Sequence, residues 1–243
     1  MTALDANSSP PSTSPLHHST LASIVSNTPY TPYYCEENVY KLVQALQSSS
    51  EVQATWGCFV SNLDQRAILF NQKASRVGIE QGSWVIWDYH VFVVAAVKQG
   101  DGERLVVIDR DSKLGEIVDF EDYIERTFYG SLFRERILDP SLESRIRIVP
   151  GLDLLQNFAS DRSHMLRDTD PSPSVQSTKP SQDYIHPAPP YPAICGPTAR
   201  QNGESHNLRT HFLDMRLGDE RDTGRFGTVL ANSTELLKYD FQR

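Results

Sequence analysis

Apolar residues follow a helical spacing near residue 40 and a strand-like density further along the chain. Four of them stand at positions i, i+3, i+4 and i+7, on one face of a predicted amphipathic helix that starts near Cys35. They are Val39, Leu42, Val43 and Leu46. Short runs rich in β-branched and aromatic residues follow, and each is typical of a strand. These runs are 56–60, 67–70, 84–87, 90–97 and 104–108.

The sequence QGDG at 99–102 separates the last two runs and is a strong turn signal, which predicts an antiparallel hairpin. Beyond it we expect helices over 120–133 and 152–159, strands over 145–149 and near 227–230, and a last helix capped by Ser233. One helix, then mostly strands, then mixed elements favour an α/β or α+β fold over a repeated βαβ fold. We therefore predict a mixed, largely antiparallel sheet flanked by helices.

Two segments have a biased composition. Residues 1–28 are dominated by Ser, Thr, Pro and Asn, and we predict a disordered tail because they bury too little apolar surface to offset the entropy of ordering. Residues 166–192 are rich in Pro, which excludes a regular helix or a central strand. We interpret 166–185 as a flexible surface loop, whereas 186–192 either continues that loop or packs as an extended arm across the domain. Residues 29–243 then form a single domain.

The overall composition narrows the class of protein. The 243 residues carry 23 basic and 31 acidic side chains, a net charge of −8, which argues against a nucleic-acid-binding protein. Three cysteines are too few, and odd in number, for a secreted disulfide framework. The longest apolar run, 91–97, is far shorter than the about 20 residues of a membrane span. Because no Lys or Arg precedes Lys41, as leader peptides require, we expect an intracellular protein with reduced cysteines.

Cys35 is the first candidate for chemistry, because it falls in the first turn of the predicted helix and on its inward face. Unpaired backbone N–H groups and the helix dipole lower the pKa of a thiol at that place and can hold an oxyanion. Glu36 and Glu37 would oppose a thiolate, so a cationic partner becomes necessary. The competing interpretation is a small buried apolar residue, which is the commoner role of a free cysteine.

His90 and Asp109 offer that partner if the hairpin has the right register. If Lys98 pairs with Asp101, His90 faces Asp109 on the same side of the sheet, with Cβ atoms about 5 Å apart. A turn shifted to 101–102 instead separates the two by four residues along the strand. A helix-borne Cys that precedes a sheet-borne His and Asp is an arrangement used for acyl transfer by thiol nucleophiles.

The other cysteines are expected to have structural roles. Cys58 lies in a predicted strand and Cys195 follows the proline-rich arm. A zinc site with His90 or His164 would need CxxC or HxxxH spacing, and neither occurs. We therefore predict neither a metal nor a cofactor.

Longer motifs occur in one order between about Tyr33 and Phe241. They are YCEENVYKL at 34–42, VIWDYHV at 85–91, VIDRD at 107–111, FASDRSHM at 158–165 and PPYP at 189–192. In this order and spacing they resemble the eukaryotic, WDYHV-type family of protein N-terminal glutamine amidohydrolases. The leader before Tyr33 and the loop 166–181 are longer than the family needs.

The resemblance implies an enzyme that converts N-terminal Gln of proteins or peptides to Glu and releases ammonia. It implies that Cys35, His90 and Asp109 are the catalytic triad, on a core similar to those of papain and transglutaminase. The segment between His90 and Asp109 is extended relative to the family, which makes Asp111 the alternative to Asp109. It further implies a role in an N-degron pathway, in the cytoplasm and also the nucleus, with components of that pathway as partners. We expect a monomer.

A free α-ammonium on the substrate calls for a carboxylate or several carbonyl acceptors. The candidates are Asp88, Glu36 and Asp161, in that order. Each also has an ordinary interpretation, as a helix-cap charge for Glu36 and as a turn or salt-bridge residue for the other two. Trp87 and Tyr89 are expected to pack in the core.

Two other functions fit the same residues. One is a papain-like or transglutaminase-like thiol protease or acyl transferase. The other is a non-catalytic module that binds the N-termini of peptides for a degradation partner.

Overall fold

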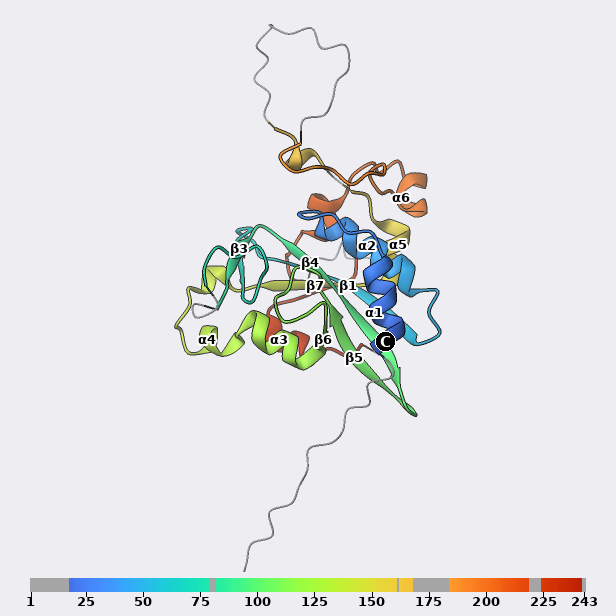
Figure 1. Ribbon diagram of the computed structural model, residues 1–243. Coiled ribbons are helices and arrows are strands. Elements are labelled where there is room, and N and C mark those ends of the chain that lie inside the picture. Colours follow the sequence, from blue (N-terminus) through green and yellow to red (C-terminus); the bar gives the residue numbers. More distant parts are fainter. Residues whose placement is uncertain (1–17, 79–81, 161, 168–183, 219–223, 242–243) are drawn as a thin grey trace, which may run out of the picture.

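The structure is a computed structural model, and it describes residues 18–78, 82–160, 162–167, 184–218 and 224–241. A six-stranded antiparallel sheet in the order β6-β5-β4-β1-β7-β8 forms its centre (Figure 1). Its strands are β1 (Val52–Ser61), β4 (His90–Gln99), β5 (Gly102–Ile108), β6 (Ile117–Asp119), β7 (Arg145–Pro150) and β8 (Thr228–Leu230). A separate two-stranded sheet pairs β2 (Ala67–Leu69) with β3 (Val85–Trp87).

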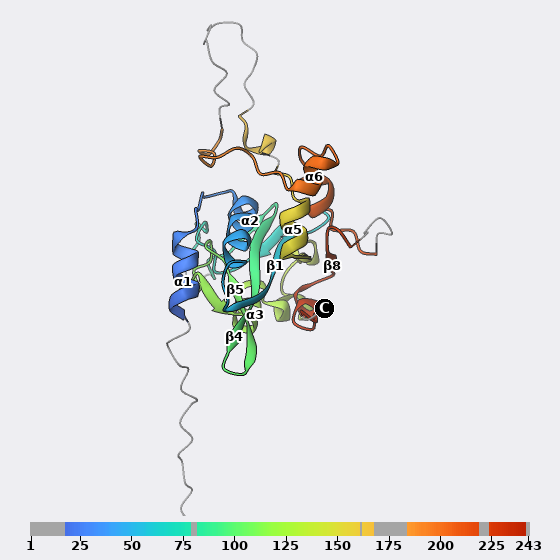
Figure 2. The same ribbon diagram turned by 90° about the vertical axis from the view of Figure 1, so that its right-hand side faces the viewer.

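Helices cover both faces of the central sheet. Helices α1 (His18–Asn27), α2 (Cys35–Leu46) and α5 (Gly151–Asn157) pack side by side on one face (Figure 2). Helices α3 (Phe120–Phe128) and α7 (Ser233–Leu236) pack on the other. The shorter helices are α4 (Gly130–Arg134), α6 (Pro197–Gln201), η3 (Pro140–Leu142), η4 (Ser163–Met165) and η5 (Leu208–Phe212). The predicted class, a mixed fold whose largely antiparallel sheet is flanked by helices, is confirmed.

The alternation of side chains along each strand divides the core in two. In β1, Phe59 contributes to the cluster under α2 and α5, whereas Cys58 and Val60 contribute to the cluster under α3 and α7. In β4, Val91 and Val93 face α2 in the same way. Successive side chains of a strand point to opposite faces, so a strand covered on both sides is apolar throughout. This explains the continuous apolar run at 91–97 without a membrane. No helix in the described parts of the chain has the length and apolar character needed to cross a bilayer.

Two expected helical features were wrong in detail. The helix predicted over 120–133 is interrupted at Tyr129, whose left-handed backbone (φ 44°) ends α3 before α4 begins. The Tyr129 ring packs edge-on against Phe70, at 4.9 Å between centroids. At the last helix the cap is Asn232 and not Ser233, because the Asn232 side chain accepts hydrogen bonds from the N–H groups of Thr234 and Glu235.

The predicted disordered tail was wrong for residues 18–28. Residues 18–27 form α1, and Leu21 and Val25 on its inward face are 5% and 1% exposed within the core under α2. The Thr28 hydroxyl donates to the Ile24 carbonyl and closes the helix. Leu21, Ile24 and Val25 stand at the helical spacing i, i+3 and i+4, but the Ser-rich composition around them led to the prediction of disorder. Residues 1–17 of the predicted tail lie outside the described residues.

The proline-rich segment packs in part. Residues 168–183 of the predicted flexible loop lie outside the described residues. Its following end, 186–192, crosses the start of α2, where Tyr34 donates to the carbonyl of His186 at 3.2 Å and Arg162 donates to that of Tyr191 at 3.0 Å. Of the two interpretations of 186–192, these contacts favour the extended arm.

The packing of α1 can be tested by mutation. Replacing Leu21 by Ala should lower the free energy of unfolding by about 2 kcal/mol, because it leaves a cavity between α1 and the core. Urea denaturation measures the change. Thr20→Ala on the exposed side of α1 is the control and should shift it by less than about 0.5 kcal/mol. Equal effects of the two substitutions would contradict the packing of α1.

Candidate active site

Cys35, Asp88 and His90 line one cavity of about 440 Å³ between the start of α2 and the junction of β3 and β4. The segment before α2, the loop after β2 and the proline-rich arm complete the walls. The other lining residues are Tyr30, Pro32, Tyr33, Lys73, Ala74, Trp87, Tyr89, Asp111, Met165, Ile185 and His186. Residues from distant parts of the sequence thus meet at one end of the sheet.

His90 and Asp109 form a buried pair beside this cavity. The His90 Nε2 lies 3.1 Å from Asp109 Oδ2, and both side chains are nearly inaccessible, at 1% and 2% exposed. The Tyr123 hydroxyl donates to the same oxygen at 2.7 Å, and the Asp111 N–H donates to Oδ1 at 2.9 Å. The Trp87 ring stacks on the imidazole at 5.5 Å. With Nε2–H donating to Asp109, Nδ1 is the nitrogen left to accept a proton.

The register of the β4–β5 hairpin differs from both registers that the sequence suggested. Gln99 pairs with Gly102, so the turn is at Gly100–Asp101, and the ladder ends where Val93 pairs with Ile108. Continued in this register, Asp109 would stand two positions from the residue opposite His90. Such diagonal neighbours share a face of the sheet and are within reach of long side chains. The expected direct facing of His90 and Asp109 was therefore wrong in register, although the contact itself forms.

The pair perturbs both pKa values. Burial on its own would raise the pKa of Asp109, but the attraction of His90 and the hydrogen bonds from His90 and Tyr123 outweigh it and lower this pKa. Burial would lower the pKa of His90, but the charge and hydrogen bond of Asp109 outweigh it and raise this pKa. Asp109 therefore stays ionised and favours the imidazolium form of His90.

Cys35 begins α2 and is partly buried. Burial raises the pKa of the Cys35 thiol well above its usual value, and the negative charges of Glu36 and Asp111 raise it further. The Val91 N–H opposes this shift by hydrogen bonding to the sulfur. Burial and two nearby carboxylates thus oppose a thiolate at Cys35, although the thiol stands at a helix start. The imidazole of His90 lines the same cavity.

Glu36 is fully buried beside the cysteine and does not line the cavity. Its Oε2 accepts from the Tyr89 hydroxyl at 3.0 Å and lies 3.7 Å from the Cys35 Sγ. Its Oε1 has no hydrogen-bond partner among the described residues. Burial raises the pKa of Glu36 to about 7, so this carboxyl group titrates near neutral pH.

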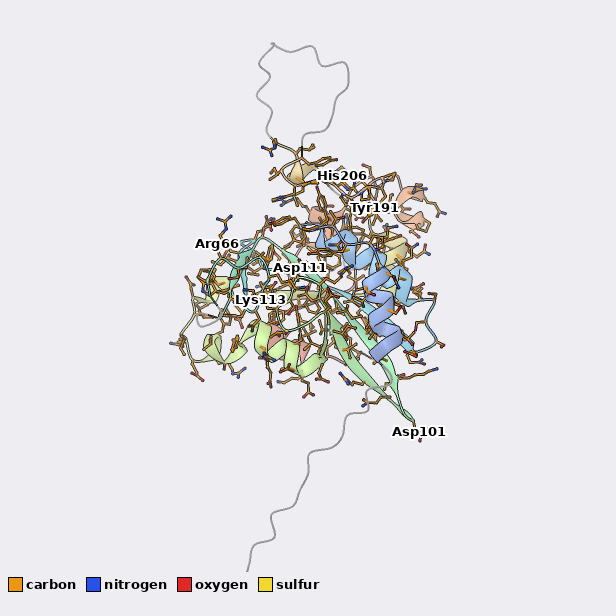
Figure 3. The ribbon with its side chains drawn as sticks, viewed as in Figure 1. Arg66, Asp101, Asp111, Lys113, Tyr191 and His206 are labelled. Atoms are coloured by element: carbon orange, nitrogen blue, oxygen red, sulfur yellow. The ribbon has the colours of Figure 1, made fainter. Side chains whose placement is uncertain are left out.

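Glu37 ties the start of α2 to the proline-rich arm, a role that the sequence did not indicate. Arg162 donates to both oxygens of Glu37, with its Nε and its Nη2 each at 2.6 Å, and the Ser160 hydroxyl also donates to Glu37. The remaining nitrogen of Arg162 donates to the carbonyl of Tyr191, which lies beside α2 (Figure 3). The one feature of the sequence that could have pointed to this role is that Ser160 and Arg162 lie two residues apart in the motif at 158–165.

The other predicted residues have varied positions. Asp88 lines the cavity with its side chain 52% exposed and lies 3.8 Å from Arg209. Asp161 lies outside the described residues. Tyr89 packs in the core as expected and Trp87 packs against it, and both also line the cavity. The wall residues Tyr30, Lys73 and Ile185 were missed, because no spacing rule connects their separate loops. They come together only in the folded chain.

Cys58 is fully buried in β1, and Cys195 is a partly buried residue outside the cavity whose thiol donates to the carbonyl of Glu204 at 3.4 Å. Across the described ranges, no group of three or more His, Cys, Asp or Glu residues is arranged to hold a metal ion.

A family model and several known proteins match this chain, and their descriptions agree. A family model described as N-terminal glutamine amidase matches residues 30–239. A zebrafish (Danio rerio) protein called protein N-terminal glutamine amidohydrolase is 33% identical over 175 residues, which cover 71% of this chain and 75% of that protein. Proteins of the same name from Arabidopsis thaliana and Caenorhabditis briggsae are 35% and 31% identical over 214 residues each. These matches cover 86% and 87% of this chain, and 85% and 94% of the two relatives.

The electrostatic pairing of His90 predicts the effect of Asp109→Asn. The pKa of His90 should fall, because burial then acts on the imidazolium without an opposing carboxylate. NMR titration of the imidazole measures this pKa. Tyr123→Phe keeps the carboxylate and is the control, with a smaller shift. An unchanged pKa of His90 in Asp109→Asn would contradict the pairing.

The same substitution should change how stability depends on pH. The raised pKa of His90 stabilises the fold below its usual value of 6.5, and this contribution is lost as the pH rises through the raised pKa. The lowered pKa of Asp109 stabilises the fold above its usual value of 3.8, and this contribution is lost as the pH falls through the lowered pKa. The stability difference between parent and variant in urea should therefore be largest between these two values.

Proposed function

Since the chain belongs to the N-terminal glutamine amidase family, we propose that it deamidates N-terminal glutamine with Cys35 as nucleophile, His90 as base and Asp109 as the residue that orients His90. The enzyme is a hydrolase that acts on an amide, and its substrates are proteins or peptides that begin with Gln. The observation that carries the catalytic assignment is the buried His90–Asp109 hydrogen bond at a cavity that Cys35 also lines.

The reaction begins when the Cys35 sulfur attacks the side-chain carboxamide carbon of the substrate while the thiol proton passes to His90 Nδ1. This step forms a tetrahedral intermediate. His90, now an imidazolium, donates a proton to the nitrogen, which leaves as ammonia when the C–N bond breaks. A water molecule that gives its proton to His90 attacks the resulting γ-glutamyl thioester. Breakage of the C–S bond releases a chain that begins with Glu and restores the Cys35 thiol.

The raised pKa of Cys35 favours proton transfer during attack over a preformed thiolate. The raised pKa of His90 stabilises the imidazolium that this transfer creates. Asp109 serves this role without changing its own protonation, since its pKa is lowered. A positioned acid–base group of this kind contributes about 10²–10⁴-fold to the rate.

The oxyanion of the intermediate needs hydrogen-bond donors. The first turn of α2 starts at Cys35 without a side-chain cap, so the Cys35 N–H is a candidate donor. Removal of one such donor typically lowers the rate by about 10²–10³-fold. The cysteine stands at the start of a helix that packs on an antiparallel sheet. This arrangement supports our proposal that the core is similar to those of papain and transglutaminase. Residues 29–243 would be the single catalytic domain, although α1, which precedes residue 29, also packs against its core.

The N-terminal Glu of the product suggests the pathway in which the enzyme acts. An N-terminal Glu is the form that eukaryotic N-degron pathways arginylate, and the resemblance of the motifs supports such a role for this chain. The enzyme would then act as a monomer in the cytoplasm and nucleus, with components of that pathway as partners.

The nucleophile can be tested by mass spectrometry of a peptide that begins with Gln. The parent protein should produce the mass gain that replaces NH₂ by OH, and Cys35→Ala should lower the rate by about 10⁴-fold or more. Cys195→Ala, at a cysteine outside the cavity, is the matched control and should retain full activity. Turnover that survives in Cys35→Ala would exclude the thiol mechanism.

The specificity can be tested with a panel of peptides that begin with Gln, Asn or acetyl-Gln, or that carry only internal Gln. Ammonia release should be confined to the first, because the substrate must present a free α-ammonium and a Gln side chain. Comparable release from acetyl-Gln or internal Gln would favour a transglutaminase-like acyl transferase. Peptide cleavage would favour a thiol protease. Binding without turnover by the parent would favour a non-catalytic module.

A further inference from the structure

One carboxylate in the cavity has no role in the mechanism above. Asp111 lines the cavity together with Cys35 and His90, and its backbone N–H supports the Asp109 carboxylate at 2.9 Å. Among the described residues His90 hydrogen bonds to Asp109 and not to the Asp111 side chain, which supports Asp109 over Asp111 as the residue that orients His90. Its position in the cavity suits it to bind substrate.

One hydrogen bond holds the Asp111 carboxylate, and further contacts hold the residues around it. The Tyr30 hydroxyl donates to its Oδ1 at 2.5 Å. The guanidinium of Arg110 lies over the Tyr30 ring at 4.6 Å and donates to the carbonyl of Thr28 at 2.7 Å, which fastens the segment before α2 to the loop after β5. The Asp111 carbonyl accepts from the Lys73 N–H at 2.7 Å. Preorganised groups of this kind bind a ligand without losing side-chain entropy.

The Asp111 carboxylate forms no ion pair with a cationic side chain in the described parts of the chain. Lys73 also lines the cavity, but its Nζ donates to the carbonyl of Arg110 at 2.8 Å and lies 4.0 Å from Glu116. A second oxygen of Asp111 therefore remains for a cation that enters the cavity.

The other acidic candidates fit less well. Asp88 is half exposed, lies near Arg209 and accepts the N–H of Tyr89, so its charge is partly satisfied and screened by solvent. Glu36 does not line the cavity and is engaged by the hydroxyl of Tyr89.

We propose that Asp111 binds the α-ammonium of the N-terminal Gln and that Tyr30 holds its carboxylate in position for this contact. The assignment rests on the proposed function, because it assumes that the Gln side chain reaches Cys35. An ammonium at Asp111 also offsets one of the charges that oppose a thiolate at Cys35. Binding of the correct substrate therefore assists the nucleophile, which a substrate with a blocked or missing amine does not do.

The test compares two peptides of the same sequence, one that begins with Gln and one in which a 4-carbamoylbutanoyl group replaces that Gln and so lacks only the α-amine. Asp111→Asn should lower kcat/KM for the first by about 10- to 100-fold, the range of a charge-assisted hydrogen bond, and should not lower it for the second, since loss of the Asp111 charge no longer opposes a thiolate at Cys35. The asparagine oxygen still accepts from Tyr30, so the cavity wall is retained. Asp101→Asn, which makes the same charge change at the far hairpin tip, should affect neither peptide (Figure 3).

A second measurement separates this assignment from the mechanism. Calorimetric binding of both peptides to Cys35→Ala, with and without Asp111→Asn, should show a loss of affinity confined to the peptide with the amine. Equal losses for both peptides would mean that Asp111 only supports the wall and would overturn the assignment. A selective loss in Asp88→Asn instead of Asp111→Asn would also overturn it. Failure of the proposed function is recognised separately, by a parent protein without Cys35-dependent turnover.

Discussion

The buried negative charge of Asp109 is the constraint on which the site depends. A carboxylate taken out of water needs hydrogen bonds and a counter-charge. Its donors come from three places: His90 at the start of β4, Tyr123 in α3, and the backbone of the loop after β5. Because α3 lies on the opposite face of the sheet from α2, both halves of the core must be in place before His90 is oriented. The apolar clusters on the two faces are therefore as much a part of the site as its polar residues.

Two neighbouring carboxyl groups, Glu36 and Glu37, are buried at the start of α2, and only one of them has a cationic partner among the described residues. Glu37 has a bidentate partner in Arg162, and the arm 186–192 is fastened to the helix through the same guanidinium. Burial raises the pKa of Glu36 to about 7, because its contacts with the Tyr89 hydroxyl and the Cys35 thiol do not offset the loss of water. One acid thus anchors the cavity wall, whereas the other influences how readily the adjacent thiol loses its proton.

The loop after β5 divides three tasks among consecutive residues. Asp109 points to His90, Arg110 covers Tyr30 and binds the Thr28 carbonyl, and Asp111 faces the cavity. This loop holds the segment between α1 and α2 and so helps to keep α1 packed on the domain. A single tight loop thus connects the orientation of the base with the shape of the substrate cavity.

Local patterns were sufficient for much of this protein: the apolar periodicity of α2, the β-rich runs, the turn signal at 99–102, and motifs specific enough to indicate the family. The sequence also indicated Cys35, His90 and Asp109. Because the two considered hairpin registers differ by an even number of residues, both place His90 and Asp109 on the same face of the sheet. What it could not decide was the register itself, the packing of α1 and the acidic wall at Asp111. Each of these depends on contacts between segments far apart in the chain, such as Tyr30 with Asp111, and such contacts exist only once burial and charge pairing are satisfied together.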